Sequence, residues 1–191
     1  MSRRSSLLAA LILSWAVGQP VILAAQTPTT PNPAPPPAAA KDVASAESII
    51  AALYDALSGT ATQERNWDRF RSLFISEGRV MPTGVPQGGK ARIRVMTPEE
   101  YARVAAPQLK GEGFYEREVA RATESFGTIV HVFSTYESRH APNDPQAFAR
   151  GINSFQLFND GSRWWIVSVL WDRERPGNPV PAKYIPSSGR E

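Results

Sequence analysis

Apolar residues recur at helical spacing near the start of the folded part of the chain. Between residues 42 and 57 they form one stripe, made of Val43, Ile49, Ile50, Leu53, Tyr54 and Leu57. This pattern predicts a helix that begins at Asp42, with Ser45 and Ser48 as alternative caps. The helix is expected to end at Ser58-Gly59, because glycine readily terminates helices.

Two further helices and a short hairpin are predicted next. The apolar spacing between Thr62 and Gly78 indicates a second helix, on which Arg65 faces water. A third helix is expected to start at Thr97, where Thr-Pro-Glu-Glu combines a cap, a first-turn proline and a capping-box glutamate. Between these two helices, residues 79–81 and 91–96 are expected to be short strands that pair as a hairpin.

The second half of the chain alternates polar and apolar residues, as strands do. Long strands are predicted over residues 111–126, 128–139, 148–158 and 163–171. The last two are separated by Asn-Asp-Gly-Ser, a sequence whose residues accept the backbone conformations of a tight hairpin turn. The expected order is therefore helix, helix, two short strands, helix and four long antiparallel strands.

The chain is expected to have four parts. Residues 1–25 combine basic, apolar and small residues in the order of a secretory signal peptide, which predicts export to the periplasm or outside the cell. An uncleaved membrane anchor is the alternative, and after cleavage no integral membrane segment is expected. Residues 26–41 are rich in proline and predict an extended linker. Residues 42–175 form the predicted domain, and residues 176–191 form a tail that packs across it.

Composition narrows the choice of partners. Without Arg3 and Arg4 of the signal segment, 19 basic residues face 18 acidic ones, a net charge of +1. This balance argues against nucleic acid as a partner, because phosphate binding needs a surplus of basic residues on one face. The chain has no cysteine, so disulfides and thiolate chemistry are impossible. No histidine or carboxylate cluster has the spacing of a metal site, and no cofactor is expected.

The element order, with its tryptophan-rich last strand after an Asn-Asp-Gly turn, resembles the nuclear transport factor 2-like superfamily, in its SnoaL-like and ketosteroid isomerase-like branch. The resemblance covers residues 42–174. It implies an α+β, cystatin-like cone, in which a strongly curved antiparallel sheet wraps around three N-terminal helices and encloses an apolar cavity. It also implies a homodimer that forms through the outer face of the sheet.

The resemblance places candidate binding residues in that cavity. Asn153 falls near the position of an oxyanion-stabilising acid, and strand alternation puts His131 on the concave face. Phe155 shares a face with Asn153, and Trp171 lies on the last strand. The register of that strand is open, since either the set with Trp165 and Trp171 or the set with Trp164 and Leu170 could line the cavity.

Three functions compete on this basis. The first is a pocket that binds a small apolar or amphipathic molecule without turning it over. The second is a cofactor-independent isomerase, dehydratase or hydrolase that uses His131 and Asn153. The catalytic base and the tyrosine of the isomerases fall at Met81 or Pro82 and at Leu53, which cannot perform those roles. Tyr54, one position along, is expected to point elsewhere. The third is a protein-interaction module with a filled interior.

Overall fold

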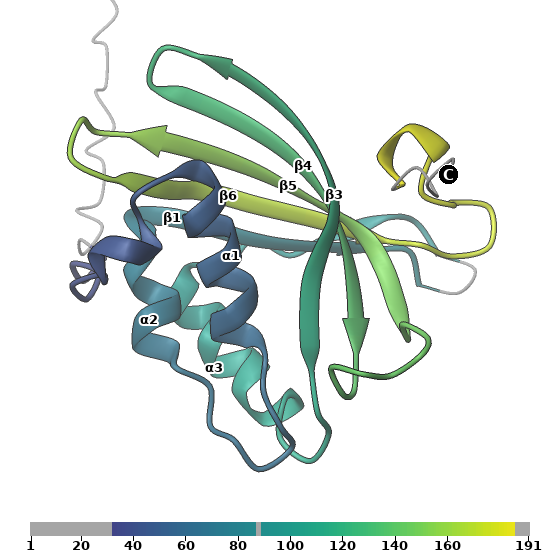
Figure 1. Ribbon diagram of the computed structural model, residues 1–191. Coiled ribbons are helices and arrows are strands. Elements are labelled where there is room, and N and C mark those ends of the chain that lie inside the picture. Colours follow the sequence, from purple (N-terminus) through teal and green to yellow (C-terminus); the bar gives the residue numbers. More distant parts are fainter. Residues whose placement is uncertain (1–31, 87–88, 186–191) are drawn as a thin grey trace, which may run out of the picture. The chain divides into compact units, whose positions relative to one another are not determined.

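The computed structural model describes residues 32–86 and 89–185 of the chain (Figure 1). Three helices, α1 (Ala46–Leu57), α2 (Trp67–Ser72) and α3 (Pro98–Gln108), lie on one side of a curved sheet. The strands are β1 (Phe74–Gly84), β2 (Arg92–Ile93), β3 (Tyr115–Phe126), β4 (Ile129–Arg139), β5 (Ala149–Asn159) and β6 (Trp164–Arg173). Short 3-10 helices, η1 (Ala40–Asp42) and η2 (Ala182–Tyr184), stand at the two ends.

The sheet is mixed. Its strand order is β2-β1-β6-β5-β4-β3, and every neighbouring pair is antiparallel except β1 and β6, which are parallel. The predicted α+β class with three helices against a curved sheet is confirmed. The expectation of a wholly antiparallel sheet is wrong at one pair, because the chain leaves β1 for a hairpin and α3 and later returns with β6 beside β1.

Capping residues set the helix starts. Ser45 caps α1, where its side chain accepts a hydrogen bond from the Ser48 backbone N–H at 3.0 Å. Thr97 caps α3 in the same way and receives the Glu100 backbone N–H at 3.1 Å, while the Glu100 carboxylate accepts from the Thr97 backbone. These reciprocal bonds satisfy N–H groups that a helix leaves unpaired at its first turn. The start of α3 agrees with the prediction, whereas α1 begins after Ser45, one of the alternative caps, and Asp42 lies in η1.

The second helix is shorter than predicted. It ends at Ser72, and Phe74 begins strand β1, which pairs with Ile166 of β6. The Ile166 backbone N–H donates to the Leu73 carbonyl at 2.9 Å, and the side chains of both Leu73 and Phe74 are fully buried. Pairing with a distant strand therefore overrides the local helical spacing, which carries only a weak preference.

Two β-bulges change which residues face the helices. In β3 the pairing with β4 skips one residue between Glu118 and Ala120. In β6 the pairing with β5 skips Val167, which has no partner between Gln156 and Leu157. A bulge of one residue reverses the alternation of side chains beyond it. In β6, Ile166 faces the core before the bulge, and Val169 and Trp171 face inward after it. Neither of the two predicted registers therefore holds along the whole strand.

The segments that flank the domain contact it. Asn32, within the predicted linker, donates a side-chain hydrogen bond to the Ser76 carbonyl at 2.9 Å, and Ala38 packs against the core. At the other end Val180 is buried, and Tyr184 packs on Phe133. The tail therefore packs across the outer face of the sheet, as predicted. The predicted signal peptide lies outside the described residues, and none of the helices within them is long and apolar enough to cross a membrane.

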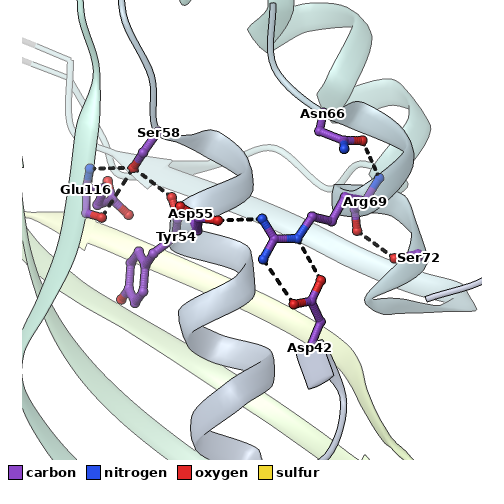
Figure 2. Close-up of polar contacts among 8 residues, drawn as sticks. All are labelled: Asp42, Tyr54, Asp55, Ser58, Asn66, Arg69, Ser72 and Glu116. Carbon is purple, nitrogen blue, oxygen red and sulfur yellow. Dashed lines mark hydrogen bonds and ion pairs between the residues drawn. The ribbon is translucent and has the colours of Figure 1, made fainter. Parts of the chain in front are cut away.

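One ion-pair cluster joins the helices at their outer side. Arg69 of α2 donates two hydrogen bonds to the Asp42 carboxylate, at 2.6 and 3.0 Å, and a third to Asp55 of α1 (Figure 2). Asp42 is buried, and the hydrogen bond from Arg69 holds the pKa of its carboxyl below the ordinary value. Such a two-pronged pair is geometrically specific, so it sets the position of α2 relative to the first turn of the domain.

Candidate functional site

A cavity of about 400 Å³ that is partly open to solvent lies between α1, α3 and the inner face of the sheet. Its volume is within the range of small-molecule pockets. Most of its wall is apolar, made by Leu53, Leu57, Phe70, Val80, Met96, Val104, Leu109, Phe114, Val169 and Trp171. A few polar groups interrupt this wall: Arg94, Tyr101, Gln108, Glu116, Tyr136, Ser138, Asn153 and Arg173. Few polar groups on an apolar surface are the usual composition of a binding pocket.

Glu116 is the acidic residue of this cavity. Its carboxylate accepts hydrogen bonds from Ser138 Oγ at 3.0 Å and from Asn153 Nδ2 at 3.3 Å. Burial nevertheless raises the pKa of Glu116 to about 7, because the apolar surroundings disfavour the charged form more than these two donors favour it. A carboxyl group with this pKa can both accept and release a proton near neutral pH.

The end of α1 holds Glu116 in place. Ser58, the C-cap of α1, accepts the Glu116 backbone N–H at 3.0 Å and donates its own hydroxyl to the Tyr54 carbonyl at 2.7 Å (Figure 2). One residue further along the chain, Gly59 exchanges two backbone hydrogen bonds with Phe114. The start of β3 is therefore fastened to the end of α1, which points the Glu116 side chain into the cavity.

Two tyrosine hydroxyls reach the same cavity. Tyr101 comes from α3 and Tyr136 from β4, and burial raises the pKa of both, with a further increase from the negative charge of Glu116. Tyr101, Tyr136 and Glu116 all line this one cavity. Neither hydroxyl has a hydrogen-bond partner among the described residues, although Tyr136 is only 3% exposed. Neither hydroxyl oxygen is fully buried, so both face the accessible space of the cavity, where they can donate a hydrogen bond to a bound molecule.

A chain of hydrogen bonds connects Asn153 to the edge of the sheet. Asn153 Nδ2 donates to the Tyr54 hydroxyl at 3.0 Å, and the Tyr54 hydroxyl lies 2.7 Å from Ser134 Oγ. Ser134 in turn donates to the Glu118 carboxylate, so the Tyr54 hydroxyl is left to donate to Ser134. The expectation that Tyr54 points elsewhere is wrong, since the helix carries it directly onto Asn153. These bonds hold the amide of Asn153 in a fixed orientation.

The structure separates the four candidate residues that the sequence suggested. Asn153 and Trp171 both line the cavity. Phe155 is fully buried and packs edge-on against Tyr54, with ring centroids 6.3 Å apart, so it belongs to the core next to the cavity. The placement of His131 on the concave face is wrong.

His131 lies on the outer face of the sheet. Its Nε2 is 3.1 Å from Ser154 Oγ, and its ring packs against Phe133, which contacts the tail. The inner face of β4 is formed by the alternate set, which includes Val132, Ser134 and Tyr136. A joint catalytic role for His131 and Asn153 is therefore ruled out by geometry, because the sheet separates their side chains.

The residues that the sequence reading missed are Glu116, Tyr101 and Tyr136. Glu116 and Glu118 lie on the same face of β3, but nothing in the sequence showed that this face points inward. Tyr101 lies in the first turns of a predicted helix at a spacing typical of core residues, so the pattern did not distinguish it from the core. The one available signal was the glutamate in the middle of an alternating, partly aromatic strand, since a carboxyl group is costly to bury without a purpose.

Metal ligands do not gather in the described part of the chain, where no group of three or more histidine or carboxylate side chains has the arrangement of a metal site. Glu116 can exchange a proton, while Tyr101 and Tyr136 can donate hydrogen bonds to an oxygen atom of a bound molecule.

Comparison with known proteins found similarity in structure only. No family model and no curated protein matches the sequence. A protein of unknown function with a cystatin-like fold from Nostoc punctiforme is 11% identical, over 67% of this chain and 87% of that one, with a TM-score of 0.51. A nuclear transport factor 2-like protein of unknown function from Methylobacillus flagellatus is 14% identical, over 68% and 89%, with a TM-score of 0.46.

A candidate ketosteroid isomerase from Parabacteroides distasonis is also similar, at 14% identity over 68% of this chain and 88% of that one, with a TM-score of 0.45. Identities this low concern the fold alone. The cystatin-like fold implied by the resemblance is confirmed.

Proposed function

We propose, starting from this cystatin-like fold and from the contents of its cavity, that the protein binds a small, mainly apolar molecule that carries an oxygen-containing polar group. The observation that carries the proposal is a mainly apolar cavity of about 400 Å³, into which two tyrosine hydroxyls point without a hydrogen-bond partner among the described residues. A ligand oxygen at this point would accept hydrogen bonds from Tyr101 and Tyr136. The aliphatic and aromatic walls would cover the rest of the molecule.

A second candidate function is proton transfer on the bound molecule. It is supported by Glu116, whose pKa of about 7 suits a group that takes up and returns protons at neutral pH. In this reaction Glu116 would remove a proton next to a carbonyl or from a hydroxyl group, and the tyrosines would stabilise the charge that develops on the oxygen. An isomerase or dehydratase activity would follow. Hydrolysis would further require a water molecule activated by the same carboxylate.

Binding can be tested with N-phenyl-1-naphthylamine, a neutral probe whose fluorescence rises in apolar surroundings. The wild-type protein is expected to bind it in a saturable manner, and Val104→Phe, which narrows the cavity, is expected to weaken binding at least about tenfold. Circular dichroism would establish that the variant is folded. Equal binding by both proteins would show that the probe does not occupy the cavity and would remove the proposal.

Catalysis can be tested separately with Glu116→Gln, which keeps the shape of the side chain and removes proton transfer. If proton transfer occurs, substrates found by screening ketones and hydroxylated compounds should be turned over by the wild type only. A substrate processed equally by both proteins would exclude Glu116 as the acid–base group, while leaving binding intact.

We also propose that the protein is exported, on the basis of the signal sequence over residues 1–25. Expression of the full chain in a bacterium, followed by fractionation and mass spectrometry, is expected to give a periplasmic form that begins at Gln26. A cytoplasmic product that retains Met1 would contradict export.

A further inference from the structure

Two arginines of the cavity wall have no acidic partner. Arg94 and Arg173 both line the cavity and are exposed, yet no carboxylate of the described residues lies within ion-pair distance of either. Seven other arginines in the same part of the chain do form ion pairs: Arg69, Arg71, Arg117, Arg121, Arg139, Arg150 and Arg175. Neither arginine of the cavity wall is therefore neutralised by a direct ion pair with a described residue, although the charge of Arg94 contributes to lowering the pKa of Glu100.

The sheet brings these two arginines to the same end of the cavity. The Arg94 backbone N–H donates to the Pro82 carbonyl at 3.1 Å, and Pro82 lies opposite Trp171 in the pairing of β1 with β6. Arg173 follows Trp171 by two residues and so shares its inward face. Strand spacing places the two arginine Cα atoms roughly 12 Å apart, a separation that two long side chains can span to reach one group between them.

The Tyr136 side chain lies in the same row across the sheet as Arg173. Tyr136, Gly151 and Arg173 form a row across β4, β5 and β6. A Cβ atom on Gly151 would stand only 2.7 Å from the Tyr136 hydroxyl oxygen, so the absence of a side chain at Gly151 lets this hydroxyl pass across the strand. The positive charge of Arg173 partly offsets the increase in the pKa of Tyr136 that burial and Glu116 cause, which agrees with proximity of the two groups.

We propose that the ligand of this cavity is an amphipathic organic anion, whose acidic group is bound by Arg94 and Arg173 with a hydrogen bond from the Tyr136 hydroxyl. A carboxylate fits this arrangement, since guanidinium groups bind carboxylates through charge-assisted hydrogen bonds. The apolar body of the molecule lies against Trp171 and the helix side chains. Glu116 is the only acidic residue among the described residues that line the cavity, so the wall as a whole favours an anion over a cation. This inference rests on the proposed binding function and names its ligand class.

A matched pair of fluorescent probes tests the charge preference. 1-Anilinonaphthalene-8-sulfonate and N-phenyl-1-naphthylamine share one ring skeleton and differ by a sulfonate group. The wild-type protein is expected to bind the anionic probe about tenfold more tightly, and Arg94→Gln and Arg173→Gln are each expected to weaken its binding about fivefold or more. Both substitutions should leave the Kd of the neutral probe within about twofold. Decanoate should displace the anionic probe more effectively than 1-decanol does.

Arg103→Gln is the control, because this substitution removes the same charge at a residue that is exposed on α3 and does not line the cavity. The inference is overturned if the neutral probe binds in the cavity but the anionic probe binds no better. It is also overturned if Arg103→Gln weakens the anionic probe as much as the cavity variants do, since the attraction would then come from net charge. Failure of both probes to bind would instead remove the proposed function itself. Circular dichroism of each variant separates these outcomes from unfolding.

Discussion

Two buried tyrosines illustrate how the surroundings of a side chain determine its role. Tyr54 accepts a hydrogen bond from Asn153 and lies within hydrogen-bond distance of Ser134, so its hydroxyl is fully used by the protein. Tyr136 is buried to the same degree and has no partner for its hydroxyl among the described residues. The first hydroxyl is used within the protein, and the second is the one that we propose to bind a ligand.

The two tyrosine-to-phenylalanine substitutions should therefore differ in effect. Tyr54→Phe leaves Asn153 without one of its acceptors and is expected to reduce the free energy of unfolding by about 1–3 kcal/mol. Tyr136→Phe removes an unpaired hydroxyl and is expected to change it by less than about 0.5 kcal/mol, while weakening ligand binding severalfold. Urea denaturation of both variants measures the difference. Equal destabilisation would contradict the assignment of a free hydroxyl to Tyr136.

The raised pKa of Glu116 makes the stability of the protein depend on pH. Between pH 4.5 and pH 7 the unfolded chain ionises at this residue while the folded protein keeps the proton, so the folded state binds more protons and stability falls as the pH rises. The loss over this interval is about 3 kcal/mol for the full shift. Above pH 7 both states are ionised and the contribution of this residue no longer changes.

Glu116→Gln should remove this dependence. The difference in free energy of unfolding between the variant and the wild type is expected to shift in favour of the variant as the pH increases from 5 to 7.5. Denaturation at both pH values measures this shift. Glu124→Gln on the same strand is the control, because its side chain is 89% exposed. If the two variants have parallel stability curves, Glu116 does not hold its proton in the folded protein.

Among the residues of the site, Asn153 and Trp171 could be predicted from the sequence and Glu116 could not. The resemblance placed Asn153 in the cavity, and Trp171 belongs to one of the two registers that the pattern of the last strand left open. Glu116 lies on an edge strand that alternates charged residues on both faces, so composition does not show which face is buried. The error for His131 has the same origin, since β4 carries apolar residues on both faces.

At the scale of elements, a buried arginine stabilises the end of the first helix. Arg65 was expected in water, but it is 5% exposed and donates hydrogen bonds to the carbonyls of Leu57, Gly59, Thr60 and Gln63. Two of these carbonyls lie at the end of α1 or just after it, where a helix has no internal donors. Arg65 thus closes the loop that holds the start of β3, and with it Glu116, against α1.

Arg65→Met is therefore expected to destabilise the protein by about 2–4 kcal/mol, because several buried carbonyls lose a charged donor. Thermal and chemical denaturation measure this loss, and Arg103→Met on the exposed face of α3 is the matched control. A loss below about 0.5 kcal/mol would show that water replaces the guanidinium at no cost and that Arg65 does not fix the loop.

The β-bulges explain why strand alternation predicted the inward and outward faces of some residues incorrectly. Before the bulge in β3, Glu116 and Glu118 face inward; after it, Arg121 faces the same side and pairs with Glu118 at 2.8 Å. The sequence pattern had placed Glu118 and Arg121 on opposite faces. A bulge depends on the curvature that two layers impose on each other, so alternation within one strand does not locate it.

At the scale of the whole molecule, the outer face of the sheet is only partly covered. The tail packs on Phe133 and Thr135, where the Thr135 hydroxyl donates to the Tyr184 carbonyl at 2.5 Å, while Gln156 near the middle of the sheet is exposed. We propose that a second copy of the chain covers this remaining area. The interface of the expected homodimer would therefore lie beside the tail, around His131 and Gln156.

Sedimentation velocity over a range of concentrations tests this dimer. The wild type is expected to sediment as a dimer at micromolar concentration, and Gln156→Arg is expected to weaken association about tenfold or more by placing like charges opposite each other across the twofold axis. Thr62→Arg, in an exposed loop on the helix side, is the control. A wild-type protein that stays monomeric at high concentration would contradict the proposal.

By itself, the sequence determined the order of the elements, the cap of α3 and the hairpin turn at Gly161, while the fold class came from the resemblance that this order carries. These depend on local preferences and on periodicity, which a single chain displays directly. Only the tertiary structure decided where β1 begins, which face of each strand points inward and that Glu116, Tyr101 and Tyr136 meet in one cavity. Those outcomes depend on pairing between distant segments and on the curvature of the packed sheet, because burial of a polar group is a property of the layers around it.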